Sequence, residues 1–245
     1  MDCRAGIMAI VILLLVFPGL YAQETSGETA APGEEYFEQG LSGSLYIPGR
    51  KLIGDPYFPR EKWIRGDVRL TTGATVKDKL LRYNGYMDEL FWLYEGDYSQ
   101  VKVDRDMIDG FILNTPTGGL RFTRITVHVP PLIWNREVLG QVMYEGDISL
   151  FCYRRVIETG LGDYLSDDKI YGGRKVRASH LYIIMLPCGK QATISRIRRS
   201  SILNLFPENR AEIRRLLRQN RLRPYNEAGL VEAMKLLDNF PGLLK

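Results

Sequence analysis

The sequence predicts an α+β protein in which an antiparallel β body is followed by C-terminal helices. Between residues 61 and 197, short segments of alternating apolar and polar residues recur, separated by turns rich in glycine, asparagine and aspartate. A helical period of apolar residues appears only after residue 198. Because strands come first and helices afterwards, a parallel sheet built from βαβ units is not expected. The body is expected to be a meander, a sandwich or a barrel-like sheet, with the helical segment 198–245 packed on it.

Residues 1–22 have the features of a secretory signal peptide. Arg4 precedes the apolar run Ile7–Leu20, and the segment ends in the small residue Ala22, as signal peptidase requires. A transmembrane anchor is the alternative, but the run is shorter than the ~20 residues that span a bilayer, and Pro18-Gly19 interrupts it. We therefore expect cleavage after Ala22, export to the periplasm or the exterior, and no transmembrane span in the mature chain.

The next segment, residues 23–60, is expected to be a flexible polar linker. It is rich in small and polar residues, contains Pro32, and follows neither the strand nor the helix period. Tyr36-Phe37 and Leu45–Ile47 are apolar enough to attach parts of it to the body.

The β body, residues 61–197, is expected to contain short strands joined by tight turns. The strongest turn signal is Asn84-Gly85, since both residues tolerate positive φ. Leu90–Tyr94 is apolar on both faces, which is typical of a buried central strand. Gly160–Gly173 is rich in glycine and aspartate and is expected to be an exposed loop. The strands expected in the body are Trp63–Leu70, Val76–Tyr83, Leu90–Tyr94, Ser99–Val103, Met107–Leu113, Leu120–Val129, Glu137–Tyr144, Ile148–Glu158, Lys175–Leu186 and Lys190–Ile197.

Three helices are expected in the C-terminal segment. Ser200 or Ser201 can cap a short helix, Pro207 suits the first turn of the second helix, and Asn226 can cap the third. A spacing of three and four residues gives each helix one apolar face. The residues on these faces are Ile202, Leu203, Leu205, Phe206, Ile213, Leu216, Leu217, Leu230, Met234, Leu237 and Phe240.

The positive charge of the chain is concentrated near its C-terminus. The formal net charge is +4, yet 12 Lys and Arg residues oppose 5 Asp and Glu residues within 189–245. Arg210, Arg214, Arg218 and Arg221 lie at helical spacing and are candidates for contact with an anionic envelope component or another envelope protein. A solvated helix face is the alternative. Nucleic acid is not expected as a partner, because the chain carries an export signal and no recognition motif.

Several short motifs form a pattern that extends over Trp63–Phe240. The C-terminal segment contains S-I-L-x-L-F-P from Ser201 and N-E-x-x-L-V-x-A from Asn226. The body contains G-x-V-x-L from Gly66, L-R-Y-N from Leu81 and D-E-L from Asp88. This pattern resembles an uncharacterised family of secreted Bacteroidota proteins that has no established activity. The resemblance implies export and identifies no functional residues. Those proteins typically have a polar residue where this chain has Cys188, which argues against a family-wide disulfide.

The histidines and cysteines follow no pattern of a metal site or a catalytic centre. His128, His180, Cys152 and Cys188 lack ligand spacings such as C-x-x-C, so no metal ion or other cofactor is expected. The histidines are expected to be ordinary strand residues. A Cys–His pair stays open, although nothing local activates Cys152. Ser99–Lys102 matches S-x-x-K, but it lies in an expected strand, whereas that chemistry favours a helix start.

Paired carboxylates are the candidates for glycosidase-type chemistry. Asp88 and Glu89 are neighbours in the sequence and would point to opposite faces of a strand. Two other groups, Asp104 with Asp106 and Asp167-Asp168, are expected to be solvated turn residues. The sequence therefore favours a non-enzymatic binding or structural protein of the cell envelope, without catalytic residues. The alternative is an envelope glycan or peptide hydrolase that uses strand-end carboxylates.

Overall fold

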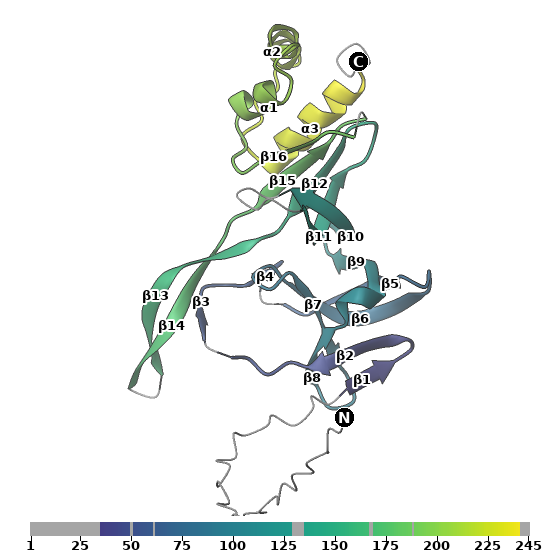
Figure 1. Cartoon of the computed structure of the whole chain (residues 1–245), viewed down its shortest axis with the longest axis vertical. Helices are drawn as coiled ribbons and strands as arrows, with labels where there is room; N and C mark the ends of the chain where they lie inside the picture. Colours follow the sequence, from purple (N-terminus) through teal and green to yellow (C-terminus); the bar gives the residue numbers. More distant parts are fainter. Residues whose placement is uncertain are drawn as a thin grey trace, which may run out of the picture. The chain divides into compact units, whose positions relative to one another are not determined.

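The computed structural model describes residues 35–49, 51–60, 62–128, 135–166, 169–187 and 189–240. The predicted fold class is confirmed, since strands occupy most of the chain and three helices follow them (Figure 1). The strands are β1 Glu35–Glu38, β2 Leu41–Leu45, β3 Leu52–Ile53, β4 Tyr57–Phe58, β5 Ile64–Leu70, β6 Thr75–Asn84, β7 Glu89–Tyr94, β8 Ser99–Val103, β9 Ile108–Thr115, β10 Gly118–His128, β11 Asn135–Tyr144, β12 Ser149–Tyr153, β13 Val156–Ser166, β14 Lys169–Ala178, β15 Leu181–Met185 and β16 Gln191–Ile194. The helices are α1 Arg199–Leu205, α2 Arg210–Gln219 and α3 Glu227–Asp238, and a 3₁₀ turn η1 covers Arg105–Met107.

In the larger sheet, all neighbouring strands are antiparallel. Its strand order is β1-β2-β8-β7-β6-β5-β9-β10-β11-β12-β15-β16, with β4 paired to β6 at one side. The path has separate ends at β1 and β16, which fits a meander or sandwich body. A smaller sheet has the order β13-β14-β3, in which β3 runs parallel to β14.

The core of the first half of the body lies around β7. Leu90, Phe91 and Trp92 are completely buried, as expected for a central strand that is apolar on both faces. Beside them, the rings of Phe111 and Phe122 stack with their centroids 4.5 Å apart. Apolar burial of this extent is the main stabilising contribution to such a sheet.

The C-terminal helices share a second core with strands β12, β15 and β16. Ile213 and Leu217 of α2 and Leu230 and Leu237 of α3 are completely buried in it. Asn226 caps α3 as predicted, because its side chain accepts a hydrogen bond from the Gly229 N–H over 2.8 Å. Among the helices of the described residues, none is long and apolar enough to cross a membrane.

Two predicted helix starts are wrong. Ser200 and Ser201 lie inside α1, whose N-cap is Arg198, and the Ser201 hydroxyl donates to the Arg196 carbonyl. The second helix begins at Arg210 rather than at Pro207. Phe206 is buried and its backbone is not helical, which ends α1. The chain then turns over residues 207–209 before α2 starts.

The predicted linker differs from the structure over its second part. Among residues 35–60, four strands form, and Leu41 is completely buried. Strand β2 pairs with β8, and these backbone hydrogen bonds compensate for the polar composition of the segment. The close pairing requires glycine at position 43, because a Cβ there would clash with the Lys102 carbonyl. Residues 23–34 lie outside the described residues, as does the predicted signal peptide.

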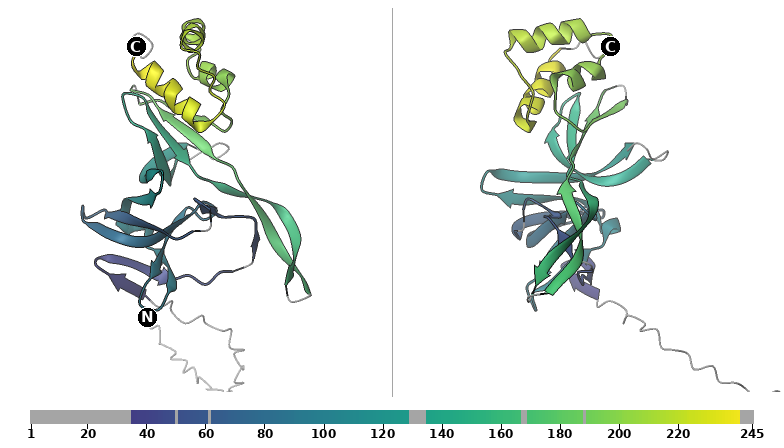
Figure 2. Two further views of the ribbon diagram at one scale, coloured as in Figure 1. Left: turned by 180° about the vertical axis from the view of Figure 1, so that it is seen from behind. Right: turned by 90° about the vertical axis from the view of Figure 1, so that its left-hand side faces the viewer.

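The predicted loop at 160–173 is also wrong, because it forms most of a long hairpin. Strands β13 and β14 pair from Val156, opposite Ala178, to Ser166, opposite Lys169. The expected strands 148–158 and 175–186 each split in two, since the hairpin leaves the larger sheet after β12 and rejoins it at β15. The left view in Figure 2 shows the hairpin extending away from the larger sheet.

Candidate functional site

The segment that contains β3 and β4 is attached to the base of the β13–β14 hairpin. Gly85, in the β6–β7 turn, joins the two. Its N–H donates to the Pro56 carbonyl over 2.8 Å, and its carbonyl accepts from the Val156 N–H over 2.9 Å. A side chain on Gly85 would clash with the Arg154 carbonyl, so this close approach requires glycine. A turn forms here as predicted, but Asn84 is still part of β6, the turn covers residues 85–88, and its positive φ is at Asp88 rather than at Asn84 or Gly85.

A cavity of 490 Å³ lies between this segment and the hairpin base, and we call it the His180 cavity. Its volume is within the ~300–1,000 Å³ that is usual for small-molecule sites. The N-terminal segment contributes Asp55, Tyr57, Phe58, Pro59 and Arg60 to its lining, and the hairpin base contributes Arg154, Val156, Arg177, Ala178 and His180.

Two residues of this lining each have one buried side-chain atom that finds no hydrogen-bond partner among the described residues. The atoms are Oδ2 of Asp55 and Nδ1 of His180. The other carboxylate oxygen of Asp55 accepts from the Tyr57 N–H over 2.8 Å, which fixes the Asp55 side chain. A buried polar atom without a partner costs about 1–3 kcal/mol, so two such atoms at one cavity indicate a place where a ligand could supply the missing partners.

Arg154 forms a fixed wall of the cavity. Its Nε donates to Gln141 Oε1 over 2.6 Å, and its two terminal nitrogens donate to the two carboxylate oxygens of Glu227 at the start of α3. Its guanidinium group also lies 4.2 Å from the centre of the Phe58 ring. The charge of Arg154 is thus compensated within the protein, which holds the hairpin base, β4 and α3 together.

The groups around Arg154 have shifted pKa values. Burial opposes ionisation of Glu227, but the hydrogen bonds and charge of Arg154, with the Tyr182 hydroxyl, outweigh it and lower the Glu227 pKa. Burial, followed by the nearby Arg154 charge, lowers the pKa of His180. His180 is therefore neutral at pH 7, and its Nδ1 can accept or donate a hydrogen bond according to its tautomer.

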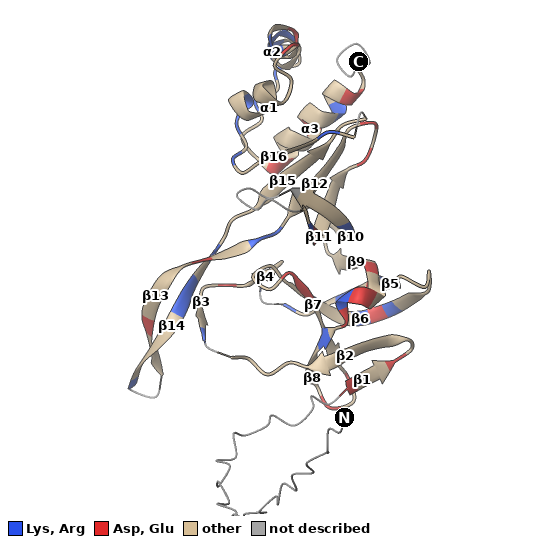
Figure 3. Cartoon of the chain, in the orientation of Figure 1, with Lys and Arg blue, Asp and Glu red and all other residues tan. Residues whose placement is uncertain are grey.

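Two further cations stand at the cavity without an ion-pair partner among the described residues. They are Arg60 and Arg177, and both are exposed. Figure 3 shows basic residues along β14, the strand that carries Arg177. The cavity thus combines a compensated buried arginine, a neutral histidine, one carboxylate and two exposed arginines.

This arrangement is suited to binding. It contains a single carboxylate, whereas glycosidase chemistry requires two. The thiol of Cys152 does not supply a nucleophile, because burial raises its pKa to about 12 despite the opposing charge of Arg154. Among the described residues, no group of three or more His, Cys, Asp or Glu side chains is placed to hold a metal ion.

No protein-family model, curated protein or solved structure matches this chain. The resemblance to secreted Bacteroidota proteins therefore stays a prediction.

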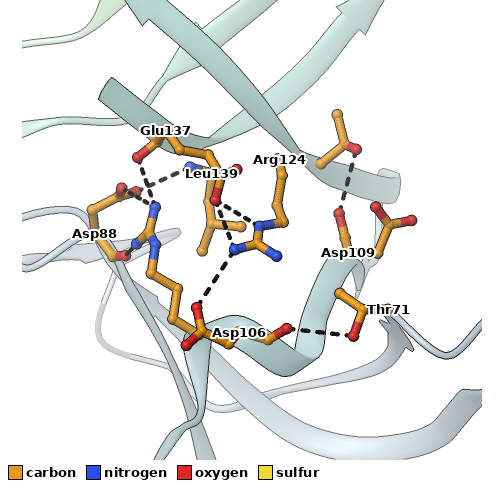
Figure 4. A network of polar contacts seen from close by, with 9 residues as sticks. Thr71, Asp88, Asp106, Asp109, Arg124, Glu137 and Leu139 are labelled. Atoms are coloured by element: carbon orange, nitrogen blue, oxygen red, sulfur yellow. Dashed lines mark hydrogen bonds and ion pairs between the residues drawn. The ribbon is translucent and has the colours of Figure 1, made fainter. Parts of the chain in front are cut away.

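The carboxylates predicted as candidates for catalysis lie elsewhere. Asp88 is completely buried, and Figure 4 shows the Leu139 N–H donating to it. Asp104 accepts from the Ser42 hydroxyl, and Asp106 is fully exposed, 3.9 Å from Arg124. Glu89 is half-buried, and burial raises its pKa. None of these four lines any cavity that we describe among residues 35–240, and Asp167 and Asp168 lie outside the described residues.

Asp88 instead belongs to a structural network. The Tyr83 hydroxyl donates to Asp88 Oδ1 over 2.7 Å, and Arg105 Nη2 donates to Asp88 Oδ2 over 2.9 Å. The same Arg105 nitrogen donates to the Glu137 carbonyl over 2.9 Å, so Asp88 joins the β6–β7 turn, η1 and β11. Burial raises the pKa of Asp88 even though Arg105 opposes the change.

The predicted arginine face is exposed. Arg210, Arg214 and Arg218 lie on α2, Arg221 follows it, and none of the four has an ion pair with a described residue. Their contact with an anion stays a prediction. The face and the His180 cavity lie on different elements, and neither contributes a residue to the other.

Sequence reasoning missed Asp55 and treated His180 as an ordinary strand residue. Asp55 was assigned to the linker. One signal could have revealed an ordered segment there, because Asp55-Pro56-Tyr57-Phe58-Pro59 places two aromatic residues between two prolines. His180 lies just before β15, between the two sheets, where no alternation pattern applies. The side chain of His128 and Cys188 lie outside the described residues.

Proposed function

We propose that this chain is an exported, non-enzymatic protein of the cell envelope that binds a small anionic ligand in the His180 cavity. One observation carries the proposal: Asp55 and His180, which line the same 490 Å³ cavity, each have a buried side-chain atom, Oδ2 and Nδ1, without a hydrogen-bond partner among the described residues. A ligand that donates to Asp55 and pairs with His180 would remove both desolvation costs.

The charges of the cavity favour an anionic ligand with hydroxyl or amino groups. Arg60 and Arg177 are exposed and can form paired hydrogen bonds with a carboxylate or phosphate group. Asp55 needs a hydrogen-bond donor, which a hydroxyl or an amino group supplies. A hydroxylated carboxylate such as a uronic acid meets both requirements.

The place of action is proposed from the sequence. Residues 1–22 have the order of charged, apolar and small residues that directs export. The family resemblance is to secreted proteins. A ligand of an exported protein comes from the envelope or its surroundings, where acidic sugars occur.

The proposal is tested by titrating the mature chain, residues 23–245, with a monomeric uronic acid and following heat or chemical shifts. Asp55→Asn keeps the Oδ1 acceptor for Tyr57 but replaces Oδ2 with a donor, and His180→Phe keeps a ring against Phe58 but removes Nδ1. Each variant should bind about tenfold more weakly, which corresponds to about 1.4 kcal/mol.

The matched control is Asp163→Asn, which makes the same chemical change on the exposed part of β13 and should leave binding unchanged. Glucose, which lacks the carboxylate, should bind more weakly than the uronic acid. No detectable uronate binding, or equal binding by all three variants, would contradict the proposed site. Thermal unfolding of each variant shows whether it is folded.

A further inference from the structure

Tyr57 lines a second cavity as well as the His180 cavity. This second cavity, which we call the Tyr86 cavity, has a volume of 620 Å³ and lies between the β3 segment and the β6–β7 turn. Tyr46, Tyr57 and Tyr86 contribute aromatic rings to it, and Lys51 and Arg174 contribute positive charge. The two cavities therefore have Tyr57 in common as a lining residue.

The aromatic walls of the Tyr86 cavity are held in place from behind. The ring of Tyr46 lies 4.6 Å from that of the buried Phe91, and the ring of Tyr57 lies 6.4 Å from it. The guanidinium group of Arg82 lies 3.8 Å from the centre of the Tyr57 ring. Rings fixed in this way lose little conformational entropy when a ligand packs on them.

Positive charge extends along both cavities. Lys51 and Arg174 stand at the Tyr86 cavity, and Arg60 and Arg177 stand at the His180 cavity. Arg174 is partly compensated by Glu158, 3.0 Å away, while both side chains stay partly exposed. Among the described residues that line the two cavities, Asp55 is the only carboxylate.

We propose that the His180 and Tyr86 cavities form one groove that binds an acidic oligosaccharide across Tyr57. This inference rests on the proposed function and extends it from one acidic sugar to a chain of them. Each cavity alone already has the size of a small-molecule site, so a ligand that fills both must be elongated.

A glycan fits the lining better than an acidic peptide does. A pyranose ring has one face of C–H groups, which packs on an aromatic ring, and hydroxyl groups at its edge, which reach polar partners. The two cavities together supply both kinds of partner, because Tyr46, Tyr57 and Tyr86 contribute rings at the Tyr86 cavity, and Asp55 and His180 contribute polar groups at the His180 cavity. The regular carboxylates of a polyuronate would match the cations spaced along the groove.

The test is a calorimetric titration of the mature chain with uronic acid monomer, dimer, tetramer and hexamer. Affinity should rise at least tenfold from monomer to hexamer, because only the longer ligands reach the second cavity. Tyr86→Ala should weaken hexamer binding about tenfold and leave monomer binding unchanged. The matched control is Tyr225→Ala. It removes a 76% exposed tyrosine that precedes α3 in the sequence, and it should bind as the wild type does.

The outcomes separate the groove from the proposed function. Equal affinity for monomer and hexamer, with no effect of Tyr86→Ala, would overturn the groove and leave the His180 cavity intact. Tighter binding of an oligoglutamate peptide than of the uronate hexamer would overturn the glycan as the ligand class. Failure of every uronate to bind would overturn both proposals. A length-dependent affinity that depends on Tyr86 would support the groove.

Discussion

Arg154 Nη2 donates a hydrogen bond to Glu227 Oε2 over 2.9 Å, and this contact joins the exit of the hairpin from the sheet to the first turn of α3. The two residues are 73 positions apart in the chain. Glu227 also lies at a helix N-terminus, where a negative charge is favourable. The pair therefore couples the wall of the His180 cavity to the C-terminal helices.

Arg154→Ala should destabilise the protein by about 2–3 kcal/mol. Breaking a fully buried ion pair costs about 3–5 kcal/mol. The loss expected here is smaller than that range, because the Glu227 side chain is 36% exposed and would stay partly hydrated. Urea unfolding measures the difference. Arg215→Ala, on the exposed face of α2, should change the free energy of unfolding by less than about 0.5 kcal/mol. A loss for Arg154→Ala no larger than that of this control would contradict a structural role for the pair.

Glu227 should make the protein sensitive to acid. Its pKa is lowered in the folded state from an ordinary value of 4.5, so its contribution to stability is present above pH 4.5 and is lost as the pH falls through the lowered pKa. Glu227→Gln removes this pH-dependent contribution to stability. The unfolding free energy of the variant should fall less steeply with pH than that of the wild type below pH 4.5, as measured by denaturant titration at several pH values. Parallel pH profiles would rule the contribution out.

Asp88→Ala should be among the most destabilising substitutions in the body. It leaves the Tyr83 hydroxyl, the Leu139 N–H and the Arg105 guanidinium without their shared acceptor. The expected loss is about 3–5 kcal/mol. Asp106→Ala, which removes a fully exposed carboxylate from the same region, serves as the control and should lose less than about 0.5 kcal/mol. A small effect at Asp88 would show that the network is not stabilising.

Cys152 should not react with thiol reagents while the protein is folded. Its thiol is completely buried and its pKa is raised to about 12, so almost no thiolate is present at pH 8. The experiment uses residues 23–245 with Cys188→Ser, so that Cys152 is the remaining thiol. Labelling should occur only in denaturant. Rapid labelling in buffer would show that the thiol is accessible.

The arginine face of α2 provides a test that is independent of the cavity. If Arg210, Arg214, Arg218 and Arg221 contact an anionic envelope component, retention on anionic vesicles or on immobilised acidic polysaccharide should fall as salt rises. The double variant Arg214→Glu with Arg218→Glu should reduce this retention without changing the affinity for monomeric uronic acid. Unchanged retention would indicate a solvated face.

Local patterns in the sequence were sufficient where burial constrains the residues of an element. The strand Leu90–Tyr94 was predicted because both of its faces are apolar, and α2 was predicted because burial of one face imposes a helical repeat. The hairpin at 156–178 was missed because both of its faces are largely exposed. Its Leu161, Leu165 and Ile170 point to solvent, and its glycines indicated a loop.

The candidate site was harder to predict than the fold. Asp55 and His180 are 125 positions apart, and no spacing rule connects them. They line one cavity because the Gly85 turn joins Pro56 to Val156 by backbone hydrogen bonds, which have no side-chain signature. Arg154 and Glu227 are likewise ordinary residues in the sequence, and only the tertiary fold makes them partners.

The ¹⁵N chemical shift of His180 Nδ1 tests the central claim most directly. The sequence contains one other histidine, His128, which serves as an internal reference. Addition of monomeric uronic acid at pH 7 should move the His180 signal in a saturable manner, with the same dissociation constant as calorimetry gives, and Asp55→Asn should weaken the response about tenfold. A His180 signal that stays unchanged while uronate binds, or one that moves no more than that of His128, would contradict binding in the His180 cavity.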